Sequence, residues 1–214
     1  MPRPRPPLVT EAELVDTLRR LDLFTPRVAA ALELARAAHA GATRRGSPLL
    51  EQHIYPVTRD VATYLARTDP AEAETGTIVA LLHDTIEEAE AVTRQMLAER
   101  FEQDVADAVA LLTKPSKVGA VTAGSGTDAA YAAAIAAGPY LVKIVKVFDR
   151  INNLTTAYRR REPDRRRYLD ETRHHYISLA TQVDPGVAAR MRDLLREQEA
   201  SAPDPEEPAG PDQL

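Results

Sequence analysis

The sequence predicts an all-α protein, and three observations support this prediction. Ala, Leu, Arg and Glu dominate the composition, and all four favour helices. Apolar residues recur at intervals of three and four, which is the period of an amphipathic helix. Aromatic residues are only 5% of the 214 residues, and no segment alternates as a half-buried strand does. We therefore expect one domain of ordinary size with a hydrophobic core.

Start and stop signals locate the first three helices. The first begins after Thr10, which has Glu13 three residues later, as in a capping box. The second begins at Pro26, a residue favoured in the first helical turn, and ends at a glycine. A short turn leads to the third, over 49–68, whose apolar stripe is formed by Leu50, Ile54, Val57 and Val61.

The middle of the chain contains the helix that we expect to be most buried. It spans 69–89 and is apolar on nearly every side in its middle. Two shorter helices are predicted over 93–101 and 102–114. The segment 115–127 has Pro, Gly and Ser without periodicity, so we expect a mobile loop that could cover a site.

The remaining helices are predicted over 128–138, 140–160, 163–183 and 185–200. The last residues of the chain are acidic and Pro-rich, with almost no large apolar group, so they should be disordered. We therefore expect a flexible N-terminus over 1–9, a folded domain over 10–199 and a disordered tail over 200–214.

Composition and charge restrict the function. The net charge of −5 gives no basic surface of the kind that binds nucleic acid through its phosphates. The chain has no Cys, so any metal ion must be held by His and carboxylates. No run approaches the roughly 20 apolar residues of a membrane span, and the N-terminal Arg residues precede no signal-peptide pattern. We expect a soluble cytoplasmic protein that binds neither nucleic acid nor membranes.

Ionisable residues interrupt the apolar run of 77–91, "TIVALLHDTIEEAEA". In a continuous helix His83 lies above Glu87 and Asp84 above Glu88, because residues four apart share a face. His83 and Asp84 could then ligate a metal ion, and the two glutamates could orient a water molecule. Imidazole and carboxylate ligands without sulfur favour a hard ion such as Mn²⁺. Alternatively, His83 and Asp84 are an ordinary polar pair at a helix end.

Two more predicted helices are interrupted by polar residues. Asp149 and Asn153 are four residues apart, and Thr156 lies three further along nearly the same stripe. His53 lies close to the apolar stripe of its helix, where a single histidine is more often a core residue than a ligand. With the His-Asp pair described above, these residues occur in the order His, His-Asp, Asp.

This order is the one shown by the HD phosphohydrolase superfamily. The resemblance is narrower than that, since four segments are similar to the hydrolase domain of RelA/SpoT-type enzymes, in particular the small alarmone hydrolases: "ATRRGSPLLEQH", "ALLHDTIEEAE", "RFEQDVADAVALLTK" and "VKVFDRINNLTT". It extends from about residue 28 to about residue 183. The resemblance implies an HD-domain helical bundle of about eight to ten helices.

The resemblance also implies a role for each matching residue. Four residues match the metal ligands, which hold Mn²⁺ in this family: His53, His83, Asp84 and Asp149. Glu87 and Glu88 match the acidic pair that positions or activates the attacking water, although the family usually has Glu-Asp there. Residues that match or lie beside substrate contacts are Arg44, Arg45, Lys146, Asn153 and Thr156.

The implied reaction is hydrolysis of guanosine tetra- or pentaphosphate, which loses its 3′-pyrophosphate to leave GDP or GTP. A divalent cation other than Mn²⁺ is possible. One alternative is an HD hydrolase of another nucleotide, such as an adenosine alarmone, NADPH or a deoxynucleotide. A second is a nucleotide-binding regulator with little turnover, suggested by Glu88 in place of Asp. Since no further domain follows the helices, we expect no synthetase activity.

Several other residues have less specific interpretations. The arginines of 159–161 and 165–167 could clamp phosphates, but such runs are more often a solvated, acid-balanced surface. Lys146 could instead extend its side chain to solvent at the rim of its helix. The remaining candidates are interpreted as packing or surface residues: Tyr168, Tyr176, His174 and His175.

Overall fold

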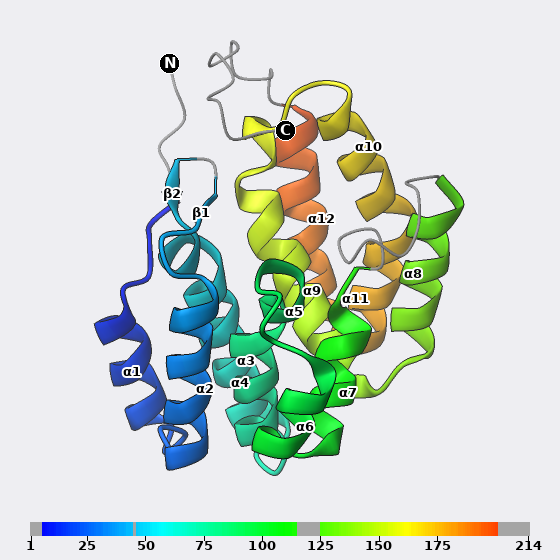
Figure 1. Ribbon diagram of the computed structural model, residues 1–214. Coiled ribbons are helices and arrows are strands. Elements are labelled where there is room, and N and C mark those ends of the chain that lie inside the picture. The colour runs from blue at the N-terminus through cyan, green and yellow to red at the C-terminus, as the bar shows by residue number, and fades with distance from the viewer. Residues whose placement is uncertain (1–5, 45, 115–124, 201–214) are drawn as a thin grey trace.

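Helices form almost all of the computed structural model, which describes residues 6–44, 46–114 and 125–200 (Figure 1). The α-helices are α1 (Glu11–Arg20), α2 (Pro26–Ala38), α3 (Tyr55–Thr68), α4 (Ala73–Leu82), α5 (Thr85–Glu88), α6 (Arg94–Phe101), α7 (Gln103–Leu112), α8 (Ser125–Ala137), α9 (Tyr140–Thr155), α10 (Asp164–Glu171), α11 (Ile177–Val183) and α12 (Pro185–Glu199). Shorter pieces are the π-helical η1 (Leu50–Ile54) and η4 (Thr172–Tyr176), the 3₁₀ turn η3 (Ala157–Arg159), and the strands β1 (Thr43–Arg44) and β2 (Ser47–Pro48). The predicted all-α fold class is confirmed.

The helices α4 and α9 form the centre of the bundle. α4 packs against α2, α3, α7 and α9, and α9 also contacts α11 and α12. Every residue of α4 from Gly76 to Leu82 is buried, which explains why its sequence is apolar on nearly every face. α9 buries three polar residues with its apolar ones: Asp149, Arg150 and Asn153. The centre of the bundle therefore contains polar groups that need partners.

A buried arginine ties α9 to the C-terminal helices. The guanidinium carbon of Arg150 lies 3.7 Å from the ring centroid of Tyr168 and 4.3 Å from that of Tyr176. Arg150 also donates a 2.8 Å hydrogen bond to Thr172 Oγ1 and forms a 3.1 Å ion pair with Glu171. Its charge is thus compensated where it is buried, and both tyrosines are packing residues, as predicted.

The predicted helix over 69–89 is divided in two directly after Leu82. The ring Nδ1 of His83 lies 2.8 Å from the carbonyl oxygen of Ala80, and the hydroxyl of Thr85 donates to the carbonyl of Leu82 at 2.7 Å. These side chains take the places of the backbone N–H groups that would continue the helix. The expectation of one continuous helix across the His-Asp motif was therefore wrong.

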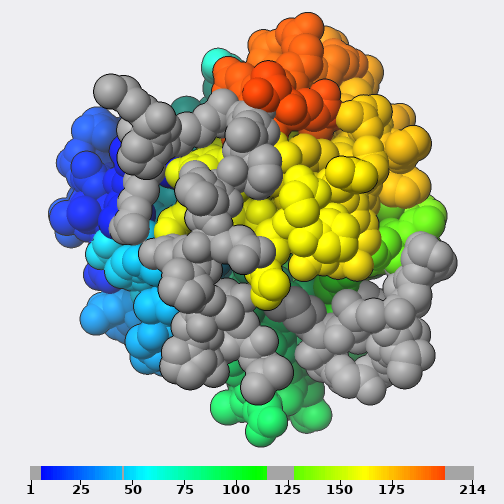
Figure 2. All heavy atoms as spheres, turned by 90° about the horizontal axis from the view of Figure 1, so that it is seen from above, coloured from blue at the N-terminus to red at the C-terminus, as the bar shows by residue number. Residues whose placement is uncertain are grey.

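A small hairpin replaces the predicted turn between the second and third helices. β1 and β2 pair antiparallel, with Thr43 opposite Pro48. Gly46 in its loop has a φ of +74°, a conformation that glycine adopts without steric cost. Strands of two residues are too short to produce an alternating pattern, so the sequence predicted no strand. Seen from above, the cyan atoms of this region lie to one side of the yellow segment that follows α9 (Figure 2).

Two predicted boundaries differ from the structure. Val9, which we assigned to the flexible N-terminus, is buried, and its N–H donates to the carbonyl of Glu51 at 2.9 Å. α8 begins at Ser125, slightly before its predicted start. The predicted loop over 115–124 and the tail over 201–214 lie outside the described residues. Among the described helices, none combines the length and apolar character that crossing a membrane requires.

The close approach of helices to α4 leads to a stability prediction. A Cβ atom on Gly76 would lie 2.2 Å from Leu65 Cδ1 and 2.9 Å from Leu141 Cδ1. We expect Gly76→Val to lower the free energy of unfolding by roughly 2–3 kcal/mol through overpacking. The matched control is Thr75→Val at the adjacent, half-buried position, where the change should stay within about 0.5 kcal/mol. Urea unfolding followed by circular dichroism measures both, and equal effects would contradict the packing argument.

Candidate active site

Four side chains from three parts of the chain meet at one point of the bundle. His53 comes from η1, His83 and Asp84 lie at the junction of α4 and α5, and Asp149 belongs to α9. The Nε2 atoms of the two histidines are 3.2 Å apart. His53 Nε2 is also 3.4 Å from a carboxylate oxygen of each aspartate. The structure therefore brings together the four residues that were predicted as metal ligands.

Each imidazole turns its Nε2 atom toward this point. His83 Nδ1 faces the carbonyl oxygen of Ala80 at 2.8 Å, so it carries the proton and donates it. His53 Nδ1 faces Asn152 Oδ1 at 2.7 Å in the same way. Burial lowers the pKa of His53, and the charge of Arg44 lowers it further, while Asp84 and Asp149 oppose this. The two Nε2 atoms consequently face each other at 3.2 Å, where both could ligate a shared cation.

Asp149 is held as a carboxylate by its neighbours. Asn153 Nδ2 donates to its Oδ1 at 2.5 Å, and Lys146 Nζ lies 3.0 Å from its Oδ2. Burial alone would raise the pKa of Asp149, but Lys146 and the two histidines together outweigh burial and lower this pKa to about 2. Asp149 in turn raises the pKa of Lys146 well above its usual range, although burial opposes this. Because the Lys146 side chain is only 15% exposed, the alternative that it extends to solvent is wrong.

Asp84 is the most accessible member of the cluster, with 19% of its side chain exposed. Burial acts to raise its pKa, but His83 and His53 outweigh burial, and the pKa lies well below its usual range. Arg44, at the end of β1, approaches Asp84 Oδ2 to 3.8 Å. The hairpin thus brings a guanidinium to the open side of the cluster, where an anionic ligand would enter.

The cluster has the donor atoms that a divalent cation requires. The ligand atoms of His53, His83 and Asp84 all lie within 4.8 Å of one another. The two histidines are 1% and 2% exposed, so a charge placed there would be shielded from water. A set of two nitrogens and two carboxylate groups suits Mn²⁺, Fe²⁺ or Zn²⁺. The residues present therefore fit a divalent metal ion.

The acidic pair lies on α5, directly after the cluster. Glu87 is half-buried, and one of its carboxylate oxygens accepts a hydrogen bond from the backbone N–H of Lys114. Burial raises the pKa of Tyr131, although the charge of Lys146 opposes this. Glu88 is exposed. The two glutamates therefore have different surroundings, although they are adjacent in sequence.

The predicted substrate contacts are only partly assembled around the cluster. Arg44 lies beside Asp84, as described, whereas Arg45 lies outside the described residues. The side-chain amide of Asn153 binds Asp149, so it orients a candidate ligand. Thr156 is buried at the end of α9 and donates to the Asn153 carbonyl at 3.4 Å. Among these residues, Arg44 has the position best suited to contact a phosphate.

Sequence reasoning missed two residues beside the cluster. Asn152 binds His53, and a metal-binding histidine usually has such an oxygen partner on its second nitrogen, so its position next to Asn153 was a usable signal. His39, at the end of α2, is buried and its ring nitrogens have no hydrogen-bond partner within the described part of the chain. Burial lowers the pKa of His39 to about 4, although the charge of Asp84 opposes this. Nothing in the helix-end sequence around His39 indicated this position.

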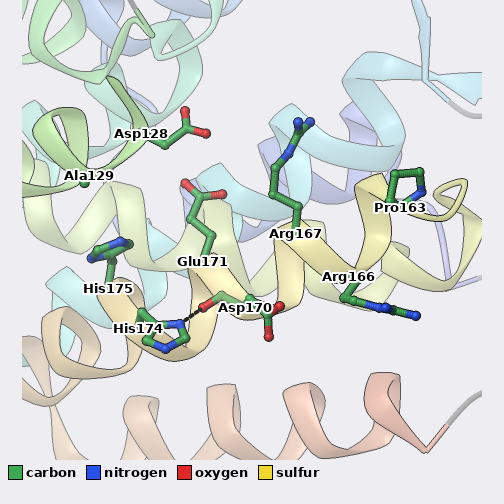
Figure 3. A pocket seen from close by; sticks show the side chains of 9 residues that line it. All are labelled: Asp128, Ala129, Pro163, Arg166, Arg167, Asp170, Glu171, His174 and His175. Carbon is green, nitrogen blue, oxygen red and sulfur yellow. Dashed lines mark hydrogen bonds between the residues drawn. The ribbon is translucent and has the colours of Figure 1, made fainter. Parts of the chain in front are cut away.

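A separate pocket of about 450 Å³ lies between α8 and the α10–η4 segment (Figure 3). The side chain of Glu171 extends toward Asp128 across it, whereas Arg166 points away. His174 Nδ1 bonds the carbonyl of Asp170 at 2.7 Å and is exposed, as its interpretation as a surface residue requires. In the described ranges, the residues lining this pocket do not converge as the His53 cluster does.

Comparison with known proteins agrees with this geometry. A family model described as an HD domain matches residues 31–185, which is most of the chain. The chain belongs to the HD domain family. It is 30% identical over 171 residues to a guanosine-3′,5′-bis(diphosphate) 3′-pyrophosphohydrolase of Aquifex aeolicus (strain VF5), an alignment that covers 79% of this chain. The chain spans only 23% of that relative's length.

A solved structure supports the same fold for this HD domain. It is described as a metazoan ortholog of SpoT that hydrolyzes ppGpp and plays a role in starvation responses. The match has a TM-score of 0.67 and covers 81% of this chain and 96% of the other, with 16% sequence identity. At this identity the match shows the fold, which is the HD-domain fold that the sequence predicted.

The Asn152–His53 hydrogen bond leads to a prediction about metal affinity. Asn152→Ala removes the acceptor that fixes the His53 ring, so Mn²⁺ should bind about 10- to 100-fold more weakly. Asn152→Asp keeps an oxygen acceptor and should bind Mn²⁺ more tightly than the alanine variant. Calorimetric titration of metal-free protein measures both affinities. Equal Mn²⁺ affinity in the alanine variant and the unmodified protein would contradict this role.

The Lys146–Asp149 pair leads to a prediction about stability without metal. Lys146→Met leaves a buried carboxylate without its cation, so the free energy of unfolding should fall by about 3 kcal/mol. Adding Asp149→Asn removes the uncompensated charge and should restore part of the loss. Urea unfolding in the presence of a chelator measures each variant. If Lys146→Met were as stable as the unmodified protein, the Lys146–Asp149 pair would contribute little to stability.

Proposed function

We propose that this protein hydrolyses guanosine tetra- and pentaphosphate, releasing the 3′-pyrophosphate and leaving GDP or GTP. The observation that carries the proposal is the convergence of two imidazole Nε2 atoms and two carboxylates, with the acidic pair on the next helix. The Aquifex aeolicus relative, which bears the name of this activity, adds support. The substrate would be a small nucleotide in the cytoplasm rather than nucleic acid, in keeping with the net charge of −5.

We propose Mn²⁺ as the cofactor, held by His53, His83, Asp84 and Asp149. Nitrogen and oxygen donors without sulfur support this choice, and another divalent cation would satisfy the same donors. When bound, such an ion supplies Lewis-acid chemistry at a phosphate group. The protein contributes the fixed orientation of its ligands, which the Asn152 and Asn153 hydrogen bonds maintain.

The acidic pair would act on the attacking water. We propose that Glu87 accepts its proton, because this carboxylate is half-buried and fixed by the Lys114 N–H. Glu88 is exposed, so it would have a smaller, supporting role. The proton would pass to Glu87 as the water oxygen bonds to the 3′-side phosphorus. The bond between this phosphorus and the ribose O3′ breaks, O3′ leaves with the bonding electrons and takes up a proton from solvent, and pyrophosphate is released.

The remaining predicted residues would either bind the substrate directly or support Asp149. Arg44, with Arg45 beside it in sequence, would neutralise phosphate charge at the open side of the cluster. Thr156 would contact the nucleotide from the end of α9. Lys146 and Asn153 would act mainly through Asp149, since both bind that carboxylate.

The assay for this function uses purified protein, Mn²⁺ and guanosine tetraphosphate, with GDP and pyrophosphate as measured products. The double variant His83→Ala, Asp84→Ala should form neither product, because it removes half of the proposed ligands. Full activity in that variant would eliminate the proposed site. Parallel incubations with an adenosine alarmone, NADPH and deoxynucleotides would identify an HD hydrolase with a different substrate.

The different surroundings of the two glutamates lead to a kinetic prediction. Glu87→Gln should lower kcat by about 10²- to 10⁴-fold, as expected for loss of a general base. Glu88→Gln is the matched control on the same helix and should have a much smaller effect on kcat. Steady-state kinetics with guanosine tetraphosphate measures both variants. The opposite order would assign the proton transfer to Glu88.

A regulator with little turnover is the second candidate, and the exposure of Glu88 is the observation that favours it. If Glu88 must act as the aspartate of related enzymes does, an exposed glutamate would leave the water poorly positioned. Calorimetry distinguishes the two functions, because the regulator binds guanosine tetraphosphate without forming GDP. Increased turnover in Glu88→Asp would further support the regulator.

A further inference from the structure

The arginines that follow α9 are less exposed than the sequence predicted, since we expected them to form a solvated surface. Arg161 is exposed, as predicted, but Arg159 and Arg160 are each half-buried. Arg165 is buried and bonds the carbonyl of Gln198, so it belongs to the packing of α10 against α12. The surface interpretation is therefore wrong for three of the six arginines in the two runs.

Arg160 is held in place by an aromatic ring. Its guanidinium carbon lies 4.0 Å from the ring centroid of Tyr168, and that same ring contacts Arg150 at 3.7 Å. Stacking on an aromatic ring leaves the in-plane N–H groups of a guanidinium available for hydrogen bonds. Tyr168 is itself buried, so the stack fixes the orientation of Arg160 before any ligand binds.

Arg160 has no counterion in the described part of the chain, in contrast to Arg150. Arg150 forms a 3.1 Å ion pair with Glu171, whereas no carboxylate of the described residues lies within ion-pair distance of Arg160. Its Nε is buried and has no hydrogen-bond partner among the residues that the structure describes. A buried donor on a charged group is costly unless something accepts from it, so this group indicates a missing anion.

The location of Arg160 connects it to the candidate active site. It directly follows η3, the turn that begins after Thr156 at the end of α9. A Cβ atom on Gly46 would lie 3.9 Å from Arg159 Nη2, so this turn approaches the loop of the hairpin that carries Arg44. Burial lowers the pKa of Arg160, and the positive charge of Arg44 contributes to the lowering. In Figure 2 yellow atoms of the segment after α9 are on the surface of the face that is seen from above.

We propose that Arg160 and Arg44 together bind a phosphate group of the nucleotide substrate other than the phosphate at the metal cluster. Two guanidiniums whose charges repel each other become favourable neighbours when an anion binds both. Arg160 also matches a phosphate in geometry, since its planar fork can donate two hydrogen bonds to phosphate oxygens. This inference rests on the proposed function, because it assumes that the ligand is a phosphorylated nucleotide. The phosphate would belong either to the leaving pyrophosphate or to the 5′-diphosphate of the product.

Product binding tests the proposal and separates the two phosphate sources. Metal-free protein is titrated with pyrophosphate and, separately, with GDP in a calorimeter. Arg160→Gln should weaken binding of one of them at least tenfold, and the affected product identifies the phosphate. Arg161→Gln is the matched control at the exposed neighbouring position and should leave both affinities within twofold. Unchanged affinity for both products in Arg160→Gln would overturn the proposal, as would absence of binding to the unmodified protein.

A purely structural role of Arg160 predicts a different pattern. Arg160→Lys keeps the positive charge, so it should recover part of the lost affinity, while Arg160→Met keeps the contact with Tyr168 and should recover none. Equal losses in all three variants, with parallel decreases in Tm, would assign Arg160 to packing alone and overturn the proposal. In turnover of guanosine tetraphosphate, Arg160→Gln should raise KM at least tenfold and leave kcat within threefold. If the unmodified protein forms no GDP, the proposed function fails, and the titrations still decide whether Arg160 binds phosphate.

Discussion

The meeting of two imidazole Nε2 atoms 3.2 Å apart, with two carboxylates beside them, is the constraint on which the rest of the structure depends. Such a group is unfavourable inside a helical bundle unless cations compensate it. Lys146 compensates Asp149 from within α9, and Arg44 approaches Asp84 from the hairpin. The two Nε2 atoms have no such cation beside them among the described residues. A divalent ion bound by both of them would supply the positive charge.

The local backbone follows from the same constraint. The chain leaves α4 at His83 because side chains bind the last carbonyls of the helix, and this turns Asp84 toward the histidines. Two arginines outside the cluster show the same dependence of a buried charge on a counterion. Arg150 is neutralised by Glu171 and serves packing, whereas Arg160 stacks on the other side of the same tyrosine without a counterion. The difference between them is the physical basis for assigning one to stability and the other to a ligand.

Much of the fold was predictable, because helix periodicity and capping are local. The Thr10–Glu13 capping box is present, with the Glu13 carboxylate accepting from the Thr10 N–H at 2.7 Å. The most apolar helix, α4, is central. The break after Leu82 was not predictable from periodicity, since it depends on hydrogen bonds made by His83 and Thr85 side chains. The surroundings of Glu87 and Glu88 differ for the same reason, as a short separate helix orients them.

By itself, the sequence determined the helical class and which residues can ligate a metal, because residue type fixes donor chemistry and spacing fixes the local helix face. Only the tertiary structure decided which donors meet. It brought His53 to His83 across 30 positions of sequence, gave each histidine a partner for its second nitrogen, and placed Asn152 and His39 beside them. It also distinguished Arg160 from its exposed neighbour Arg161. Burial and counterions depend on contacts between distant segments, and a local pattern in one segment does not contain them.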